Sequence, residues 1–149
     1  MPFEGLGASV LRLVADTNVV VSALLWRGKP HALFKAAEDH ELQFFTTRLL
    51  LDELDTVLAR RKLTKAVRAT GSTRGELLGD YQELAHIVPP AQTRRIVLAD
   101  PGDDKVLACA IAARAELIVS GDRHLLDLKT YQGIPVVNAA KALARLSQR

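Results

Sequence analysis

The chain has 149 residues, of which 48% are hydrophobic and 25% are charged, and its formal net charge is +3. These values predict one globular domain over residues 1–149, with residues 1–10 as a loose N-terminal extension. They argue against a membrane protein, because no apolar run is long enough to cross a bilayer, and against a disulfide scaffold, because Cys109 is the single cysteine. No signal peptide is evident, so we expect a cytoplasmic protein in which Cys109 is reduced and buried.

Short apolar runs alternate with helical patterns along the first half of the chain. The continuous apolar run Leu11–Ala15 predicts a buried strand, and a helix is expected from Lys29-Pro30, since proline suits a first helical turn. After a strand at 43–46, the spacing of apolar residues predicts a helix over 48–63 that Thr46-Thr47 can cap.

The second half continues this alternation. A capping box from Thr73 to Glu76 begins a helix, and 86–88 is expected to be a short strand. A turn at Asp100–Gly102 precedes a helix at 103–116 that is apolar on nearly every side. Strands at 116–120 and 135–137 follow, then a helix at 139–148 that Asn138 can cap. The pattern predicts an α/β domain with a parallel sheet.

The charges are unevenly distributed. Basic residues gather at Arg60–Lys62 and again at Arg94-Arg95, whereas acidic residues gather at 52–55 and 100–104. A slightly basic solvated surface is one interpretation of this pattern. The pattern would also suit a site in which acidic residues bind cations and the basic residues beside them contact a polyanion.

Acidic residues directly follow two of the expected strands, at the edge of the sheet where open α/β domains bind ligands. These residues are Asp16 and Asp122. Glu53 lies within the helix expected at 48–63, and Asp103 and Asp104 begin the helix expected at 103–116. Any one of them could simply cap a helix, but a cluster of them would repel unless protons or cations neutralised it.

Clustered carboxylates suit Mg²⁺ or Mn²⁺, whereas one cysteine and scattered histidines offer no zinc site. Such a cluster, without a nucleophilic serine or cysteine, indicates metal-assisted hydrolysis of a phosphoester. The sequence is compatible with one bound ion or with two.

Four segments together are similar to the PIN-domain ribonucleases: VADTNVVVSALLW at 14–26, LLLDELDTVLAR at 49–60, DPGDDKVLACAIAARAELIVSGDRHLL at 100–126 and IPVVNAAKAL at 134–143. Within that family the chain resembles the bacterial toxins of toxin–antitoxin pairs, related to the VapC-type toxins. The similarity extends from Arg12 to Leu143. It implies a PIN-like three-layer α/β/α fold with a central parallel sheet, and cleavage of RNA with Mg²⁺ or Mn²⁺.

The resemblance also implies roles for individual residues. The acids of the family that hold the metal are matched by Asp16, Glu53, Asp104 and Asp122. Asp103 is a candidate for a further ligand or a helix cap. Asn18 and Ser120 match polar positions that support the metal site and its water. Thr17 has a weaker assignment, because its hydroxyl could simply cap the helix or hydrogen-bond locally.

Contacts with RNA phosphates are expected from Arg60, Arg61 and Arg123, which lie next to the motifs in sequence. The resemblance implies two protein partners, a small antitoxin that occludes the acidic site and a second copy of the chain in a homodimer. No membrane partner is expected. Aromatic residues make up only 5% of the chain, so no base-stacking platform is evident.

Three alternative functions are compatible with parts of this pattern. A housekeeping PIN-type nuclease that processes RNA would carry the same acids. A haloacid-dehalogenase-like phosphatase also has an aspartate after its first strand, but it needs a second aspartate where this chain has Asn18. A non-catalytic RNA-binding module would have no reason to keep carboxylates that repel one another.

Overall fold

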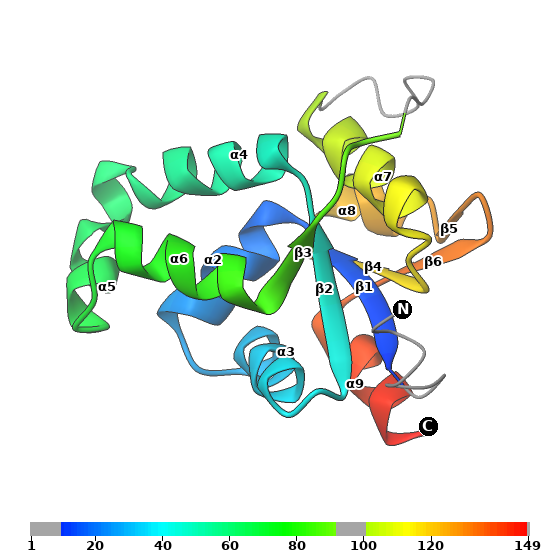
Figure 1. The fold of residues 1–149 in the computed structure, drawn as a ribbon, viewed down its shortest axis with the longest axis horizontal. Helices are drawn as coiled ribbons and strands as arrows, with labels where there is room; N and C mark the ends of the chain where they lie inside the picture. The colour runs from blue at the N-terminus through cyan, green and yellow to red at the C-terminus, as the bar shows by residue number, and fades with distance from the viewer. Residues whose placement is uncertain (1–9, 92–100, 149) are drawn as a thin grey trace.

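In the computed structural model, which describes residues 10–91 and 101–148, the chain folds around one six-stranded sheet (Figure 1). The strands lie in the order β3-β2-β1-β4-β6-β5. Their bounds are β1 (Leu11–Ala15), β2 (Leu42–Thr46), β3 (Ala85–Ile87), β4 (Leu117–Val119), β5 (Thr130–Tyr131) and β6 (Ile134–Val137). Neighbouring strands run parallel except β5 and β6, which are antiparallel. The predicted α/β class with a central parallel sheet is confirmed.

Helices connect the strands and cover both faces of the sheet (Figure 1). Their bounds are α2 (Thr17–Leu25), α3 (Lys29–Glu38), α4 (Arg48–Leu58), the 3₁₀ turn η1 (Arg61–Leu63), α5 (Thr64–Ala69), α6 (Arg74–Leu84), α7 (Pro101–Ala113), α8 (Arg123–Leu126) and α9 (Ala139–Ser147). None of the helices in the described part of the chain is long and apolar enough to cross a membrane.

Two hydrophobic cores lie on the two faces of the sheet, because successive side chains of a strand point to opposite faces. Leu13 and Phe44 belong to the core that α2, α3, α4, α6 and α9 complete. Their neighbours Val14 and Phe45 belong to the other core, which contains the apolar side of α7. Cys109 of α7 is fully buried there, as expected. The three layers of the predicted fold follow from this alternation.

Local signals in the sequence predict several boundaries correctly. β1 has the predicted ends. The capping box at the start of α6 is present, with Thr73 Oγ1 accepting from the Glu76 N–H at 3.1 Å and Glu76 Oε1 accepting from the Thr73 N–H at 2.8 Å. Thr47 caps α4 and Asn138 caps α9, each by accepting a backbone N–H.

Several predicted boundaries are wrong, and the helix expected at 103–116 ends already at Ala113. The helix expected over 48–63 ends at Leu58, because Arg60 is extended with ψ of 137°, and η1 and α5 follow instead. The sequence predicts a turn at Asp100–Gly102 before the helix, but Pro101 and Gly102 already belong to the first turn of α7. Asp100, the basic pair Arg94-Arg95 and residues 1–9 lie outside the described residues.

The carboxyl ends of β1 and β4 lie side by side near the middle of the sheet. Ala15 pairs with Val119, and the backbone N–H of Asp16 donates to the Val119 carbonyl at 3.0 Å. The segments that follow these two strands therefore begin at neighbouring points. On the other side of β1, β2 leads directly into α4. Side chains from α2, α4 and the segment after β4 can meet at this edge.

Candidate metal and nucleic-acid site

A pocket of about 240 Å³ opens at the carboxyl ends of β1 and β4, and we call it the acid pocket. It is lined by Asp16, Thr17, Asn18, Glu53, Val57, Arg60, Asp103, Val106 and Asp122. The acids come from parts of the chain that are far apart in sequence. The fold therefore brings together Asp16, Glu53 and Asp122, as the sequence analysis expected of these residues.

Asp16 is the most constrained of these acids. It caps α2, with Oδ1 accepting from the Val19 N–H at 3.0 Å, and its Oδ2 accepts from the Ser120 hydroxyl. Burial raises the pKa of Asp16, and the charges of Asp122 and Glu53 raise it further, whereas the hydrogen bonds from Ser120 and Val19 lower it. A carboxyl that is buried beside two other acids is costly to ionise unless a proton or a cation offsets its charge.

Ser120 links the first acid to the last. Besides donating to Asp16, its Oγ accepts from the Asp122 N–H at 2.9 Å. Asp122 in turn caps the short helix α8, where its Oδ1 accepts from the His124 N–H at 2.8 Å. Ser120 is fully buried, so its hydroxyl holds both acidic residues at fixed positions.

Glu53 is held by a residue on a different helix. It lies on the side of α4 that also presents Val57 to the acid pocket, and Arg60, just after the helix, lines the same pocket. The Thr17 hydroxyl donates to Glu53 Oε1 at 2.6 Å. This contact is not local, because Thr17 and Glu53 are 36 positions apart in the sequence.

The start of α7 contributes Asp103, not Asp104, to the pocket wall. Asp103 is buried and lines the acid pocket, as does Val106 one helical turn further on, whereas Asp104 is not among the lining residues. Adjacent residues of a helix project about 100° apart, and of these two only Asp103 lines the pocket. The lining of the pocket therefore favours Asp103, which the sequence offers as a further ligand or a helix cap, over Asp104, which matches the third acid of the family.

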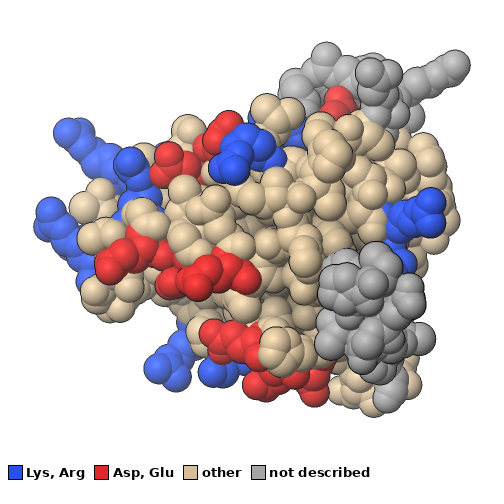
Figure 2. Space-filling view, viewed as in Figure 1, with Lys and Arg blue, Asp and Glu red and all other residues tan. Residues whose placement is uncertain are grey.

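The predicted polar and basic residues fall into two groups. Asn18 and Arg60 line the acid pocket with their side chains exposed to solvent. Arg61 and Arg123 are exposed but do not line it. Lys and Arg side chains gather around α5, whereas Asp and Glu side chains lie over α6 and α3 (Figure 2). The acid pocket thus adjoins the basic side of the molecule through Arg60.

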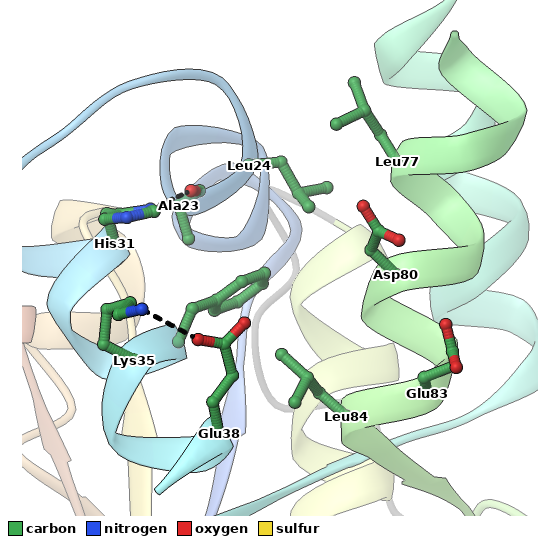
Figure 3. A pocket seen from close by; sticks show the side chains of 10 residues that line it. Ala23, Leu24, His31, Lys35, Glu38, Leu77, Asp80, Glu83 and Leu84 are labelled. Atoms are coloured by element: carbon green, nitrogen blue, oxygen red, sulfur yellow. Dashed lines mark hydrogen bonds and ion pairs between the residues drawn. The ribbon is translucent and has the colours of Figure 1, made fainter. Parts of the chain in front are cut away.

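A cavity of about 400 Å³ between α2, α3 and α6 has a different character (Figure 3). Glu38 of α3 lies on one side of it, and Asp80 and Glu83 of α6 lie on the other. Lys35 is already paired with Glu38 at 3.2 Å. None of the residues that line this cavity lines the acid pocket, so the two are separate.

The donor types of the acid pocket fit a hard divalent cation. Within residues 10–91 and 101–148, no three His, Cys, Asp or Glu side chains form a group that could hold a metal directly. Mg²⁺ keeps several of its waters and usually takes only one or two carboxylates as direct ligands. A pocket with separated carboxylates is therefore suited to an ion bound partly through water.

The PIN domain sequence profile matches residues 12–124, which is more than half of the chain. This protein belongs to the PIN domain family. A search of curated proteins found no match.

PIN domains are generally nucleases that act on RNA, and they generally use divalent metal ions. Membership of this family favours a nuclease over the haloacid-dehalogenase-like phosphatase. The acid pocket of this PIN domain lies at the edge of the sheet where its fold class binds ligands.

Proposed function

We propose that this PIN domain is an endoribonuclease that depends on Mg²⁺ or Mn²⁺ and hydrolyses RNA phosphodiester bonds in the acid pocket. The observation that supports it is the convergence of Asp16, Glu53, Asp103 and Asp122 on one pocket, with Asp16 buried. We assign the third acid to Asp103 in place of Asp104 because Asp103 lines the pocket.

In this proposal the carboxylates hold the cation and neighbouring hydroxyls hold the carboxylates. Ser120 orients Asp16 and the backbone of Asp122, and Thr17 orients Glu53. When bound, the cation would offset the negative charge of the acids, polarise the phosphoryl group and lower the pKa of an attacking water. Because the carboxylates are oriented before RNA arrives, little rearrangement is needed on binding.

RNA as the substrate is supported by the cations beside the acids. Arg60 lines the acid pocket, and Arg61, Lys62, Lys65 and Arg68 are exposed along the chain that follows it. Arg123 is exposed next to Asp122. Contacts of these side chains with phosphates would give affinity with little sequence preference.

The decisive experiment measures cleavage of a defined RNA panel with Mg²⁺, with Mn²⁺ and with EDTA. We expect cleavage with either ion, none with EDTA, and none by the Asp16→Asn protein. Binding of the RNA without cleavage under all conditions would instead favour the non-catalytic RNA-binding alternative.

Asp103 and Asp104 offer a matched pair of variants for the third acid. We expect Asp103→Asn to lower kcat/KM by about 100-fold or more, as loss of a catalytic carboxylate does, and Asp104→Asn to lower it by only a few-fold. The reverse order would restore the assignment made from the sequence.

We further propose that the nuclease acts in the cytoplasm as the toxin of a toxin–antitoxin pair, as a homodimer. The support for this part is the resemblance of the sequence motifs to VapC-type toxins. Induced expression should then arrest growth, and co-expression of a small antitoxin encoded beside the gene should relieve the arrest. Cleavage without growth arrest would favour a housekeeping nuclease. Size-exclusion chromatography with light scattering tests the homodimer.

A further inference from the structure

A second cavity, which we call the side pocket, adjoins the acid pocket. Its volume is about 410 Å³, within the range of about 300–1,000 Å³ that is typical of small-ligand sites. It is lined by Asn18, Val19, Ser22, Pro30, Ser120, Gly121, Asp122, Asn138 and Ala139. Asn18 and Asp122 also line the acid pocket, so a molecule in one pocket is next to a molecule in the other.

The side pocket combines small apolar surfaces with polar groups that are available to a ligand. Val19, Pro30 and Ala139 supply apolar wall. Asn138 uses its Oδ1 to cap α9, accepting from the Lys141 N–H at 2.9 Å, so its side-chain NH₂ group remains to donate elsewhere. Asn18, whose side chain is exposed, contributes a second amide at the boundary between the two pockets.

The lining of the side pocket is mostly neutral. It includes the carboxylate of Asp122 and no lysine or arginine among the described residues, so no cationic side chain is present to hold a phosphate. A flat neutral ring with hydrogen-bonding edges would match the amides and the apolar wall better. Asparagine amides hydrogen-bond well to the edges of nucleobases.

We propose that the side pocket binds the nucleobase of a nucleotide adjoining the phosphodiester bond that is cleaved in the acid pocket. This inference rests on the proposed ribonuclease function. The side-chain amides of Asn18 and Asn138 hydrogen-bond to the edge of the base, and Pro30 and Ala139 contact its ring. The cleaved bond is therefore chosen partly by a base, and not only by contacts with phosphates.

The test scans one abasic nucleotide through an RNA that the wild-type protein cleaves. An abasic nucleotide keeps the backbone charge and removes only the base. We expect kcat/KM to fall tenfold or more when the abasic nucleotide is at one position next to the cleaved bond, and to change little at distant positions. Equal cleavage at every abasic position would overturn the inference and leave the ribonuclease function intact.

Two variants connect this effect to the side pocket. Ala139→Leu fills the pocket and should reduce cleavage of the intact RNA while making the abasic penalty disappear. Ala144→Leu, at an exposed position of α9, is its matched control and should behave as wild type. Asn138→Asp keeps the helix cap and loses the donor, so it should also reduce the abasic penalty. Identical behaviour of Ala139→Leu and Ala144→Leu would overturn the inference.

A binding measurement separates this inference from catalysis. Fluorescence anisotropy with the Asp16→Asn protein should show tighter binding of the intact RNA than of the RNA that is abasic beside the cleaved bond. If the wild-type protein cleaves no RNA, the proposed function fails. The same set of abasic RNAs is then compared by their binding affinities alone. Equal affinity for intact and abasic RNA at all positions would then overturn the side-pocket inference independently.

Discussion

The Thr17 hydroxyl donates a 2.6 Å hydrogen bond to Glu53 Oε1 and thereby joins the first turn of α2 to the middle of α4. Glu53 is only partly buried, so without this bond its long side chain would have several rotamers available. Thr17 follows Asp16 directly, which means that one short segment positions two of the acids. Residues in such supporting roles typically change metal affinity or activity by about 10–100-fold when they are replaced.

Replacing Thr17 should therefore weaken the binding of Mg²⁺ without unfolding the protein. Thr17→Val removes the hydroxyl at nearly constant shape, and we expect the Mg²⁺ concentration for half-maximal cleavage to rise by about tenfold. Thr17→Ser keeps the hydroxyl and is the matched control. The measurement is cleavage rate against Mg²⁺ concentration for the three proteins. Similar curves for Thr17→Val and Thr17→Ser would contradict the supporting role.

Asp16→Asn should make the metal-free protein more stable. Burial raises the pKa of Asp16 above its ordinary value of 3.8, so the folded state holds this proton more tightly than the unfolded state. Its contribution to stability is therefore full below pH 3.8 and is lost as pH rises through the raised pKa. At neutral pH the ionised carboxylate is destabilising. A neutral amide, whose oxygen can accept from Val19 and whose NH₂ can donate to the Ser120 hydroxyl, should therefore raise Tm in EDTA.

Thermal unfolding with and without cation checks this prediction. Mg²⁺ or Mn²⁺ should raise the Tm of wild type, because a ligand that binds only the folded state stabilises it. The same ions should have a much smaller effect on Asp16→Asn. A Tm for Asp16→Asn below that of wild type in EDTA would show that the ionised carboxylate stabilises the fold.

Arg60→Gln should weaken RNA binding and reduce its dependence on salt. If Arg60 contacts a phosphate, its loss should reduce the slope of log affinity against log salt by about one. Arg145→Gln, an exposed change in the last turn of α9, is the control. Binding of RNA to both proteins is measured across a series of salt concentrations. Equal slopes for Arg60→Gln and wild type would exclude the phosphate contact.

Cys109 should be unreactive in the folded protein. Burial raises the pKa of its thiol from 9.0 to about 12, so almost no thiolate exists at neutral pH. We expect a thiol reagent at pH 8 to label the chain only after denaturation. The stability advantage of wild type over Cys109→Ala should fall as pH rises from 9 toward about 12, because only the unfolded thiol ionises there. Rapid labelling of the native protein would contradict the burial.

Elements with local signals are predictable from the sequence. Leu11–Ala15 is a continuous apolar run, and the capping box from Thr73 to Glu76 needs only residues within one turn. The end of α4 is not predictable in this way, because the apolar spacing continues past Leu58 while the backbone becomes extended at Arg60. The spacing of apolar side chains carries no information about the change from helical to extended backbone at Arg60.

The site is predictable in its chemistry but not in its details. Asp103 and Asp104 both precede an apolar helix, so only the packing of α7 against the sheet decides which one lines the pocket. The Thr17–Glu53 bond depends on how α2 lies beside α4. The side pocket is invisible in the sequence because its walls come from α2, α3, the segment after β4 and the start of α9.

The central position of β1 in the sheet has a consequence for the order in which the acid pocket is assembled during synthesis of the chain. Asp16 and Glu53 are translated early, whereas Ser120 and Asp122 follow only after β4, which pairs with β1. Asp16 accepts a hydrogen bond from Ser120, which is 104 positions away in the chain, and Ser120 accepts one from the backbone N–H of Asp122. A partly made chain that ends before β4 therefore lacks Ser120 and Asp122 and has no complete acid pocket.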